Sequence, residues 1–266
     1  MKIGILGLGV VGTAVKTGLR ELGHTISYYD PKHKDSKFND VLDTDVCFIC
    51  VPTPPDANGK CNTSIVKSSL QSLLEQNYKG VVAIKSTISP GTTDSFIKSY
   101  PALSICFVPE FLRERCAVTD FIENHDLCVI GTEDDASFKL IKKAHGHYPV
   151  TTIQLKPIEA EMTKYFNNIY NATLITLANS FFEVCESLGA NYTAVKDALV
   201  NRNHITNAYL QCNKNFRGFG GVCLPKDTLA IATLVKELGL DIKFFKTLLE
   251  ENDKYQTTVY DGMRKE

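Results

Sequence analysis

The sequence predicts an α/β fold, in which a doubly wound, mostly parallel sheet is followed by an all-helical domain. The first observation is that short apolar runs alternate with stretches of helical periodicity as far as Leu155. The second is that this alternation then stops, and Pro157–Leu188 contains no internal glycine or proline. We therefore expect a Rossmann-type domain at residues 1–156 and a helical domain at residues 157–266.

Seven apolar runs are typical of strands buried on both faces of a sheet. In chain order they are KIGILG (2–7), TISYYD (25–30), VCFICV (46–51), VVAIKST (81–87), LSICFVP (103–109), LCVIG (127–131) and VTTIQL (150–155). Helical periodicity marks residues 11–22 and 64–76 between them, the long stretch 157–188 behind them, and then 193–200, 228–238 and 243–255. Proline at the start of the long stretch and Gly189 at its end are the expected helix boundaries.

The composition is that of a globular protein with a neutral surface. Lys and Arg total 29 against 30 Asp and Glu, and no basic block stands out, so neither nucleic acid nor a membrane is an expected partner. A predicted strand begins at Lys2, which leaves no room for a signal peptide. Nine irregularly spaced cysteines, an odd number, then indicate reduced thiols and a cytoplasmic protein. Cys47 and Cys50 form a CxxC, but in a strand they would face opposite ways, which argues against a metal or redox site.

A dinucleotide-binding fingerprint follows the first predicted strand. The segment Gly7-Leu8-Gly9-Val10-Val11-Gly12 lies between that strand and a predicted helix, which is the context that a GxGxxG motif requires. Gly7 permits a tight turn, Gly9 lets a pyrophosphate approach the backbone, and Gly12 lets helix and strand pack closely. The helix N-terminus supplies N–H groups for the phosphates.

The second predicted strand ends at Asp30, whose carboxylate would distinguish NAD from NADP. A carboxylate there would accept hydrogen bonds from the adenosine ribose and repel a 2′-phosphate, so NAD is favoured over NADP. Lys32, His33 and Lys34 follow and weaken that preference.

Polar residues share one face of the long helix. Glu161, Lys164 and Asn168 are spaced i, i+3 and i+7. Such a face is often merely solvated, but an ammonium and a carboxamide one turn apart can together bind a developing oxyanion.

One cysteine has an unusual setting, FRGFGGVCLPKD at residues 216–227. The glycines before Cys223 leave room for a ligand beside the chain, and Lys226 provides a positive field that favours a thiolate. Pro225 stiffens the segment, and Asp227 can serve as N-cap of a helix beginning at Thr228. The alternative, a small buried hydrophobic residue, describes the other eight cysteines better than Cys223.

These residues together resemble the UDP-glucose/GDP-mannose dehydrogenase family, whose members oxidise a nucleotide-sugar alcohol to a uronate. The motifs that resemble the family's, in the same order, are VPTPPD (51–56), KSTISPGT (85–92), PEFLRE (109–114), KYFNNIYNA (164–172) and GFGGVCLPKD (218–227). The resemblance covers essentially the whole chain.

The resemblance implies a four-electron oxidation that uses two NAD molecules in turn. Lys164 and Asp227 match the groups around the reacting alcohol, and Cys223 matches the thiol that attacks the resulting aldehyde. It also implies that Lys164 and Asn168 stabilise the thiohemiacetal oxyanion. A thioester follows, whose hydrolysis needs Glu110 as general base and Thr87 to position the water.

The resemblance further implies the binding residues. Those expected to line the NAD site, besides the glycine loop, are Thr53, Pro54, Ser86, Thr87, Glu114 and Lys226. Those expected to contact the nucleotide sugar, UDP-glucose above all, are Glu110, Phe111, Leu112, Lys164, Asn168, Phe216, Arg217, Gly218, Phe219 and Gly220. A homodimer through the long helix is implied, and no metal.

Two features depart from the family pattern. The family continues into a third domain that binds the nucleotide, whereas this sequence ends at Glu266, so we expect that domain to be lacking here. His204 stands where the family commonly has an arginine that reaches the partner subunit's substrate, with Arg202 two residues earlier. Two alternatives stay open: a β-hydroxyacid or 6-phosphogluconate-type dehydrogenase, which needs no thiol, and an NAD-binding remnant without activity.

Overall fold

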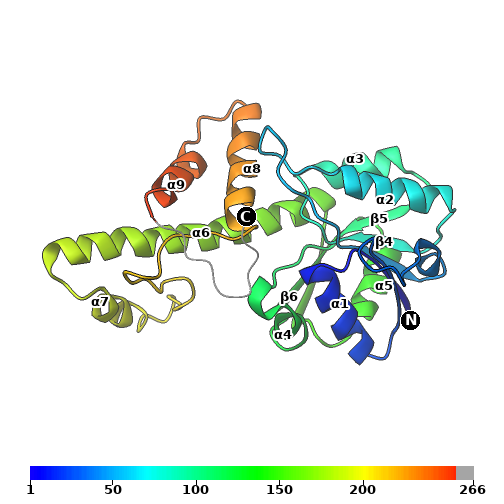
Figure 1. Cartoon of the computed structure of the whole chain (residues 1–266), viewed down its shortest axis with the longest axis horizontal. Coiled ribbons are helices and arrows are strands. Elements are labelled where there is room, and N and C mark those ends of the chain that lie inside the picture. Colours follow the sequence, from blue (N-terminus) through cyan, green and yellow to red (C-terminus); the bar gives the residue numbers. More distant parts are fainter. Residues whose placement is uncertain (256–266) are drawn as a thin grey trace. The chain divides into compact units, whose positions relative to one another are not determined.

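A computed structural model describes residues 1–255, which form two compact units. The first unit comprises residues 1–56 and 61–164, and the second comprises residues 57–60 together with the chain from residue 165 onward. Figure 1 shows the sheet with its flanking helices and, separately, the helices that follow. The domain boundary near residue 156 stays a prediction. No helix in residues 1–255 combines the length and apolarity that a membrane crossing requires.

The first unit is built on a seven-stranded sheet, and all seven predicted strands are confirmed. The strands are β1 (Lys2–Leu6), β2 (Thr25–Tyr29), β3 (Val46–Ile49), β4 (Val81–Ile84), β5 (Ser104–Phe107), β6 (Leu127–Gly131) and β7 (Thr151–Leu155). Their order is β2-β1-β3-β4-β5-β6-β7, and every neighbouring pair is parallel except β5 with β6. The strand order reverses next to β1, and ligands of such sheets bind at the carboxyl edge beside this point.

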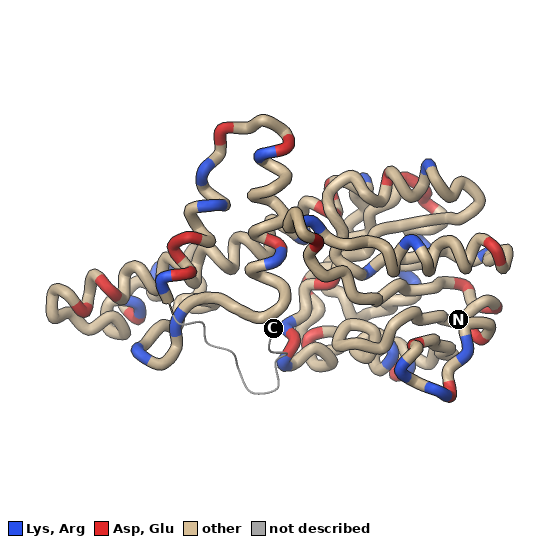
Figure 2. Tube along the Cα trace, turned by 45° about the horizontal axis from the view of Figure 1, so that its top comes forward, with Lys and Arg blue, Asp and Glu red and all other residues tan. Residues whose placement is uncertain are grey.

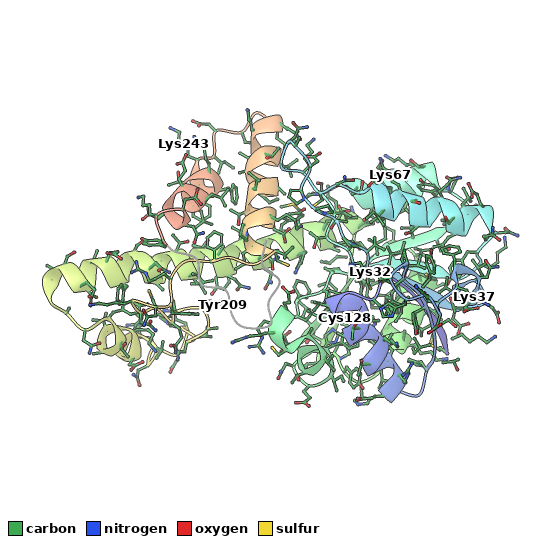
Figure 3. All side chains as sticks on the ribbon, in the orientation of Figure 1. Lys32, Lys37, Lys67, Cys128, Tyr209 and Lys243 are labelled. Carbon is green, nitrogen blue, oxygen red and sulfur yellow. The ribbon has the colours of Figure 1, made fainter. Side chains whose placement is uncertain are left out.

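Helices cover both faces of the sheet, which is why the inner strands β3 and β4 are apolar and buried throughout. One face packs against α1 (Val10–Glu21), α4 (Ala117–Ile122) and α5 (Asp135–His145). The other packs against α2 (Ser64–Glu75), α3 (Thr92–Ser99) and the first turns of the long helix α6. Cys47 lies in one of these two cores and Cys50 in the other, as expected for a strand. Cys128, on β6, is a further buried thiol of this unit (Figure 3).

The second unit is helical. The helix α6 has the predicted bounds, Pro157–Leu188, and is followed by α7 (Tyr192–Leu199), α8 (Leu224–Glu237) and α9 (Phe244–Asn252). Tyr165, Ile169 and Ala172 of α6 form one core with buried residues of α8 and α9. Phe182 and Cys185, further along α6, form a second core with Tyr192 of α7.

One predicted helix boundary is wrong. The sequence suggested Asp227 as N-cap of a helix beginning at Thr228, but α8 begins at Leu224 and its N-cap is Cys223. Proline is tolerated in the first turn of a helix, where its missing N–H has no partner to lose, so Pro225 lies inside α8 and not before it. Asp227 therefore belongs to the first helical turn. Positions of Lys and Arg and positions of Asp and Glu are interspersed along the Cα trace of the described residues (Figure 2).

Candidate active site

Apart from Lys226, which lies in α8 of the second unit, the residues predicted to bind NAD follow strands of the first unit at the same edge of its sheet, as does the predicted general base Glu110. The glycine loop follows β1, Asp30 follows β2, and the segment from Val51 to Asp56 follows β3. Lys85–Thr87 follows β4 and Glu110 follows β5. Because β1 to β5 are parallel, these segments lie side by side at the carboxyl edge.

The glycine loop has the geometry that its three glycines predict. Gly7 has a φ of +90°, and a Cβ there would lie 2.7 Å from the carbonyl oxygen of Cys50. A Cβ on Gly12 would lie 1.9 Å from the carbonyl oxygen of Gly7, so α1 approaches the turn as closely as it can. A Cβ on Gly9, by contrast, would meet no atom within 4 Å, which leaves the space that a phosphate group needs at the start of α1. Val10 and Val11 form the first turn of α1. The loop therefore fits a dinucleotide.

Asp30 is held against this loop. Its Oδ2 accepts a hydrogen bond of 2.7 Å from the N–H of Leu8, and its Oδ1 accepts one of 2.9 Å from the N–H of Lys32. Burial alone would raise the pKa of Asp30, but these two hydrogen bonds, together with the nearby charges of His33 and Lys32, outweigh it and lower the pKa. The carboxylate therefore stays ionised beside the glycine loop, with lone pairs left for a ribose hydroxyl.

The loops after β3 and β4 are joined by two hydroxyl groups. The Oγ1 of Thr53 donates to the carbonyl oxygen of Thr87 over 2.7 Å, and the Oγ of Ser86 donates to that of Val51 over 2.7 Å. Four residues predicted from motifs in separate parts of the sequence, Thr53 with its neighbour Pro54 and Ser86 with Thr87, thus lie together. The hydroxyl groups of Thr53 and Ser86 therefore hold the loop after β3 against the loop after β4.

Glu110 forms a buried ion pair that the sequence did not predict. Its Oε2 lies 2.9 Å from the Nζ of Lys85, and the two side chains are 9% and 1% exposed. Burial alone would raise the pKa of Glu110, but the ammonium of Lys85 outweighs it and lowers the pKa. Glu110 is therefore a carboxylate, the form that a general base needs.

The surroundings of Glu110 include further predicted residues. The Nζ of Lys164, near the start of α6, donates a hydrogen bond of 2.6 Å to the carbonyl oxygen of Glu110 and lies 5.7 Å from the ring centroid of Phe111. Leu112 packs against the core, and Glu114 begins the short 3-10 helix Glu114–Cys116. The segment PEFLRE is thus fixed at the end of β5, with Lys164 against it.

In the second unit, Cys223 differs from the other cysteines. Its side chain is exposed, while seven of the other eight are buried and Cys116 is half-buried. As N-cap of α8, Cys223 lies at the positive end of the helix dipole, which stabilises negative charge on sulfur.

One turn into α8 lies a buried carboxylate with two partners. The Oδ2 of Asp227 accepts a hydrogen bond of 2.6 Å from the Nδ2 of Asn168, and its Oδ1 lies 2.6 Å from the Nζ of Lys226. Asp227 is completely buried, and the side chain of Lys226 is nearly so. Asn168, Asp227 and Lys226 were each predicted as site residues, and within this unit they form one network.

The glycine segment before Cys223 is also fixed. Gly218 and Gly221 have positive φ angles, and between them the ring of Phe219 is buried in the core of α6, α8 and α9. The Oδ1 of Asn252 accepts from the N–H of Phe219 over 2.7 Å, and its Nδ2 donates to the carbonyl oxygen of Phe219 over 2.9 Å. Asn252 was not among the predicted site residues, although it fixes the segment that includes Phe216 and Gly220.

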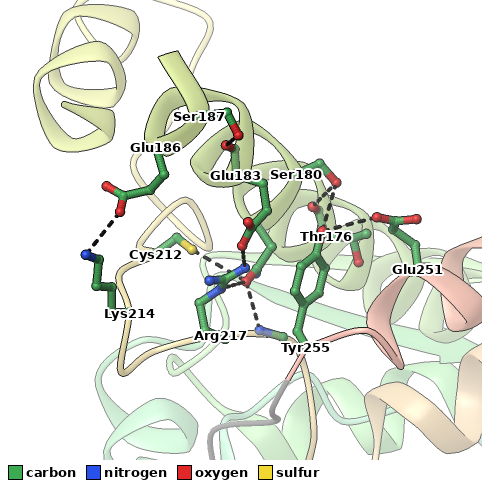
Figure 4. A network of polar contacts seen from close by, with 12 residues as sticks. Thr176, Ser180, Glu183, Glu186, Ser187, Cys212, Lys214, Arg217, Glu251 and Tyr255 are labelled. Atoms are coloured by element: carbon green, nitrogen blue, oxygen red, sulfur yellow. Dashed lines mark hydrogen bonds and ion pairs between the residues drawn. The ribbon is translucent and has the colours of Figure 1, made fainter. Parts of the chain in front are cut away.

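Arg217, predicted to contact substrate, has its side chain in an intramolecular network (Figure 4). Its guanidinium pairs with Glu183, donates to the Oδ1 of Asn179 over 2.7 Å, and lies 4.8 Å from the ring centroids of Phe182 and Tyr255. Its contact with the substrate stays a prediction. Residues 1–255 contain no group of three or more His, Cys, Asp or Glu that could hold a metal.

Two family models match the chain. The model described as the UDP-glucose/GDP-mannose dehydrogenase family, NAD binding domain, matches residues 32–148, and that family's central domain matches residues 158–254.

Similar proteins bear consistent names. The UDP-glucose 6-dehydrogenase AglM of Haloferax volcanii is 28% identical over 99% of this chain, and TuaD of Bacillus subtilis, another UDP-glucose 6-dehydrogenase, is 28% identical over 98%. The chain spans 72% and 65% of the lengths of these two relatives.

Solved structures agree with this. A UDP-glucose dehydrogenase from Pyrobaculum islandicum is similar with a TM-score of 0.84 and 28% identity, over 95% of this chain and 68% of that one. A 3-hydroxyisobutyrate dehydrogenase from Mycobacterium tuberculosis shares the fold, with a TM-score of 0.76 and 16% identity, over 95% of this chain and 92% of that one. The fold therefore occurs in dehydrogenases of more than one kind, and the side chains must distinguish them.

Proposed function

Because the chain belongs to the UDP-glucose/GDP-mannose dehydrogenase family, we propose that it oxidises a nucleotide sugar, UDP-glucose in the first place, to the uronate through a thioester on Cys223. It is an NAD-dependent oxidoreductase, and the 6-dehydrogenases of Haloferax volcanii and Bacillus subtilis support UDP-glucose as the sugar nucleotide. The observation that carries the proposal is the exposed thiol of Cys223 at the N-terminus of α8.

NAD, when bound, accepts a hydride in each of the two oxidations. The glycine loop at Gly7, Gly9 and Gly12 would hold its pyrophosphate, and Asp30 its adenosine ribose. Thr53, Pro54, Ser86, Glu114 and Lys226 are proposed to complete the site.

In the first oxidation, a hydride leaves the alcohol carbon and a proton leaves its oxygen, which gives an aldehyde. We assign Lys164 and Asp227 to the reacting oxygen, with a bound water as the proton's path. Asp227 suits this role as a buried carboxylate whose two oxygens are oriented by Asn168 and Lys226.

In the second stage the thiolate of Cys223 adds to the aldehyde carbon. The ammonium of Lys164 and the carboxamide of Asn168, one turn apart on α6, are proposed to stabilise the oxyanion of the thiohemiacetal. Loss of a second hydride leaves the thioester. Glu110 then removes a proton from water, with Thr87 positioning that water, and the thiol is released as the acid forms.

The sugar and its diphosphate are assigned to two segments. Phe111 and Leu112 follow Glu110 in the first unit, and residues 216–220 precede Cys223 in the second. In the second segment the side chain of Arg217 is paired with Glu183 and the ring of Phe219 is buried. The N–H groups of Phe216, Gly218 and Phe219 also donate within the chain, so we propose that the glycines contribute chiefly by leaving room for the substrate beside the backbone.

We further propose a cytoplasmic homodimer. All nine cysteines lie in the described part of the chain and none of them forms a disulfide there, which suits a reducing compartment. Large apolar side chains of α6 are exposed, including Phe166 at 74% and Leu188 at 78%, and such a row is typical of an interface.

The test measures how many NADH form for each uronate, in wild type and in two variants. Purified protein is given UDP-glucose and NAD, with GDP-mannose and UDP-N-acetyl sugars in parallel, and NADH and uronate are both measured. Two NADH for each uronate supports the proposal, and one NADH without an acid contradicts it. Cys223→Ser should lower uronate formation by roughly 10³-fold or more, since no thioester can form, while the half-buried Cys116→Ser is the matched control.

The same experiment separates the alternatives. A β-hydroxyacid dehydrogenase uses no thiol, so its activity would survive Cys223→Ser. A remnant would bind NAD in calorimetry but neither bind nor oxidise a nucleotide sugar.

A further inference from the structure

We propose that Lys85 is a positioning residue for thioester hydrolysis: its buried ion pair keeps Glu110 ionised and aims one oxygen of that carboxylate at the attacking water. The inference rests on the proposed function, because it assigns a task to a residue that acts only through Glu110.

The pair is built by the sheet. Ile84, the last residue of β4, is paired with Phe107, the last residue of β5, so the two chains leave the sheet side by side. Lys85 follows Ile84 directly, and Glu110 lies three residues after Phe107. The Nζ of Lys85 lies 2.9 Å from the Oε2 of Glu110, and both side chains are buried. Bringing a lysine and a glutamate out of water costs free energy, and so their burial at a proposed catalytic position calls for a role.

The two carboxylate oxygens have different surroundings. Oε2 accepts from the Nζ of Lys85, whereas Oε1 accepts from the N–H of Phe111 over 3.1 Å. Each carboxylate oxygen has two lone pairs, so Oε1 can accept a second hydrogen bond, from a water. The backbone of Glu110 is held as well, since its carbonyl oxygen accepts from Lys164 over 2.6 Å. Contacts on Oε2, Oε1 and the main chain leave the carboxylate little freedom to rotate.

The ammonium of Lys85 is enclosed by uncharged groups. The ring centroids of Phe48 and Phe121 each lie 5.7 Å from its Nζ. Of the ionisable groups nearby, burial raises the pKa of the thiols of Cys50 and Cys128 to about 12, which leaves them neutral.

Two histidines also face the pair. Burial lowers the pKa of His125, and it lowers that of His145 to about 3, so both are neutral at neutral pH. Each ring is fixed by its Nδ1 on a backbone carbonyl, of Phe121 and Ile141 respectively. The positive charge in contact with the carboxylate of Glu110 therefore comes from Lys85.

Loss of Lys85 would change the protonation state of Glu110. Without the ammonium of Lys85, burial would raise the pKa of a carboxylate that is 9% exposed, because the N–H of Phe111, which still donates to Oε1, carries no full charge. A larger fraction of Glu110 would then be protonated. A protonated Glu110 cannot take a proton from water. Hydrolysis would then slow while formation of the thioester, which does not use Glu110, would continue.

The experiment follows single turnovers with UDP-glucose and NAD, quenched at intervals and examined by mass spectrometry for the acyl group on Cys223, across a series of pH values. Lys85→Met should let the thioester accumulate at neutral pH and should move the acid limb of hydrolysis upward by about 1 pH unit or more. The first reduction of NAD should change by less than about threefold. Lys67→Met, an exposed lysine of α2, is the control and should behave as wild type.

Two further variants separate the role from stability. Lys85→Gln keeps a hydrogen-bond donor to Oε2 but removes the charge, so it should shift the acid limb in the same direction as Lys85→Met. It therefore serves as the test if Lys85→Met does not fold. The double variant Lys85→Met/Glu110→Gln removes both buried charges, and it should fold but not hydrolyse the thioester at any pH.

The outcomes are distinct. If wild type never shows an acyl group on Cys223, the proposed function itself is wrong. If wild type forms the thioester and the Lys85 variants hydrolyse it at the wild-type rate with an unmoved acid limb, only this inference is wrong. The inference is equally overturned if oxidation and hydrolysis decline together at an unchanged pH dependence, because that pattern indicates a merely structural role.

Discussion

The Nδ2 of Asn168 donates a hydrogen bond of 2.6 Å to the Oδ2 of Asp227, which joins α6 to the first turn of α8 behind Cys223. Asp227 is completely buried, so this contact compensates one of its carboxylate oxygens for the loss of bulk water. The packing of α6 against α8 therefore determines where Asp227 lies, four residues after Cys223.

We expect Asn168→Leu to lower the free energy of unfolding by about 1–3 kcal/mol, because the Oδ2 of Asp227 loses its donor in a buried place. Urea unfolding measures this. Asn171→Ala, a half-buried asparagine on the same helix, is the matched control and should cost less than about 0.5 kcal/mol. Equal losses in both variants would mean that the contact contributes nothing specific.

The glycine loop offers a pair of substitutions with opposite outcomes. Gly9 has a φ of −72° and free space around a Cβ, so Gly9→Ala should fold normally. Its methyl group would occupy the place proposed for the phosphate, and the Kd for NAD should rise by about tenfold or more, or ~1.4 kcal/mol. Calorimetric titration with NAD and thermal unfolding without it measure the two effects. Unchanged NAD affinity in folded Gly9→Ala would place the pyrophosphate elsewhere.

Gly12→Ala is the counterpart. Its Cβ would lie 1.9 Å from the carbonyl oxygen of Gly7, which is backbone and cannot move aside. The free energy of unfolding of this variant, measured without NAD, should therefore fall by about 1–3 kcal/mol or more. A Gly12→Ala protein as stable as wild type would contradict the close approach of α1 to the turn.

Asp120 of α4 gives a prediction for pH. Burial alone would raise the pKa of Asp120, but hydrogen bonds from Arg113 and Asn124 outweigh it and lower the pKa to about 2. A carboxylate with a lowered folded pKa stabilises the fold above its unfolded pKa of 3.8, and that contribution is lost as the pH falls toward 2.

The stability gap between wild type and Asp120→Asn should therefore be full at neutral pH and shrink as the pH falls from about 4 to 2. Denaturant unfolding at several pH values measures the gap. Asp35→Asn, on the exposed surface, should show a small gap at neutral pH. A gap for Asp120→Asn that persists undiminished at the lowest pH would show that the pairing with Arg113 is not its source.

The sequence predicted the sheet well for a physical reason. Strands covered by helices on both faces are continuous apolar runs, and VCFICV or VVAIKST can hardly be anything else between helical stretches. The long helix was equally clear, since nothing between Pro157 and Leu188 interrupts it. The pattern did not single out α3, α4 and α5, which have 8, 6 and 11 residues, although it identified α7 and α9, which are about as short.

The site was predicted in its chemistry but not in its contacts. Motifs in the sequence identified Glu110 and Cys223. The ion pair of Glu110 with Lys85, however, forms because β4 and β5 are neighbours in the sheet, and a local sequence pattern does not predict which strands are neighbours. Asn252 meets Phe219 across 33 residues for the same kind of reason. The N-cap prediction for Asp227 failed because Pro225 was interpreted as a residue before the helix, when it lies in the first turn.

The exposed row on α6 predicts self-association. Phe181, 53% exposed, lies in this row with Phe166 and Leu188, and burying such side chains against a second copy would favour a dimer. Light scattering after gel filtration should then find wild type as a dimer and Phe181→Lys as a monomer, because a lysine at the centre of an apolar interface is costly. Val195→Lys, at a 46% exposed position on α7, is the matched control and should stay dimeric. A monomeric wild type at every concentration measured would refute the dimer, and a dimeric Phe181→Lys would place its interface away from this row.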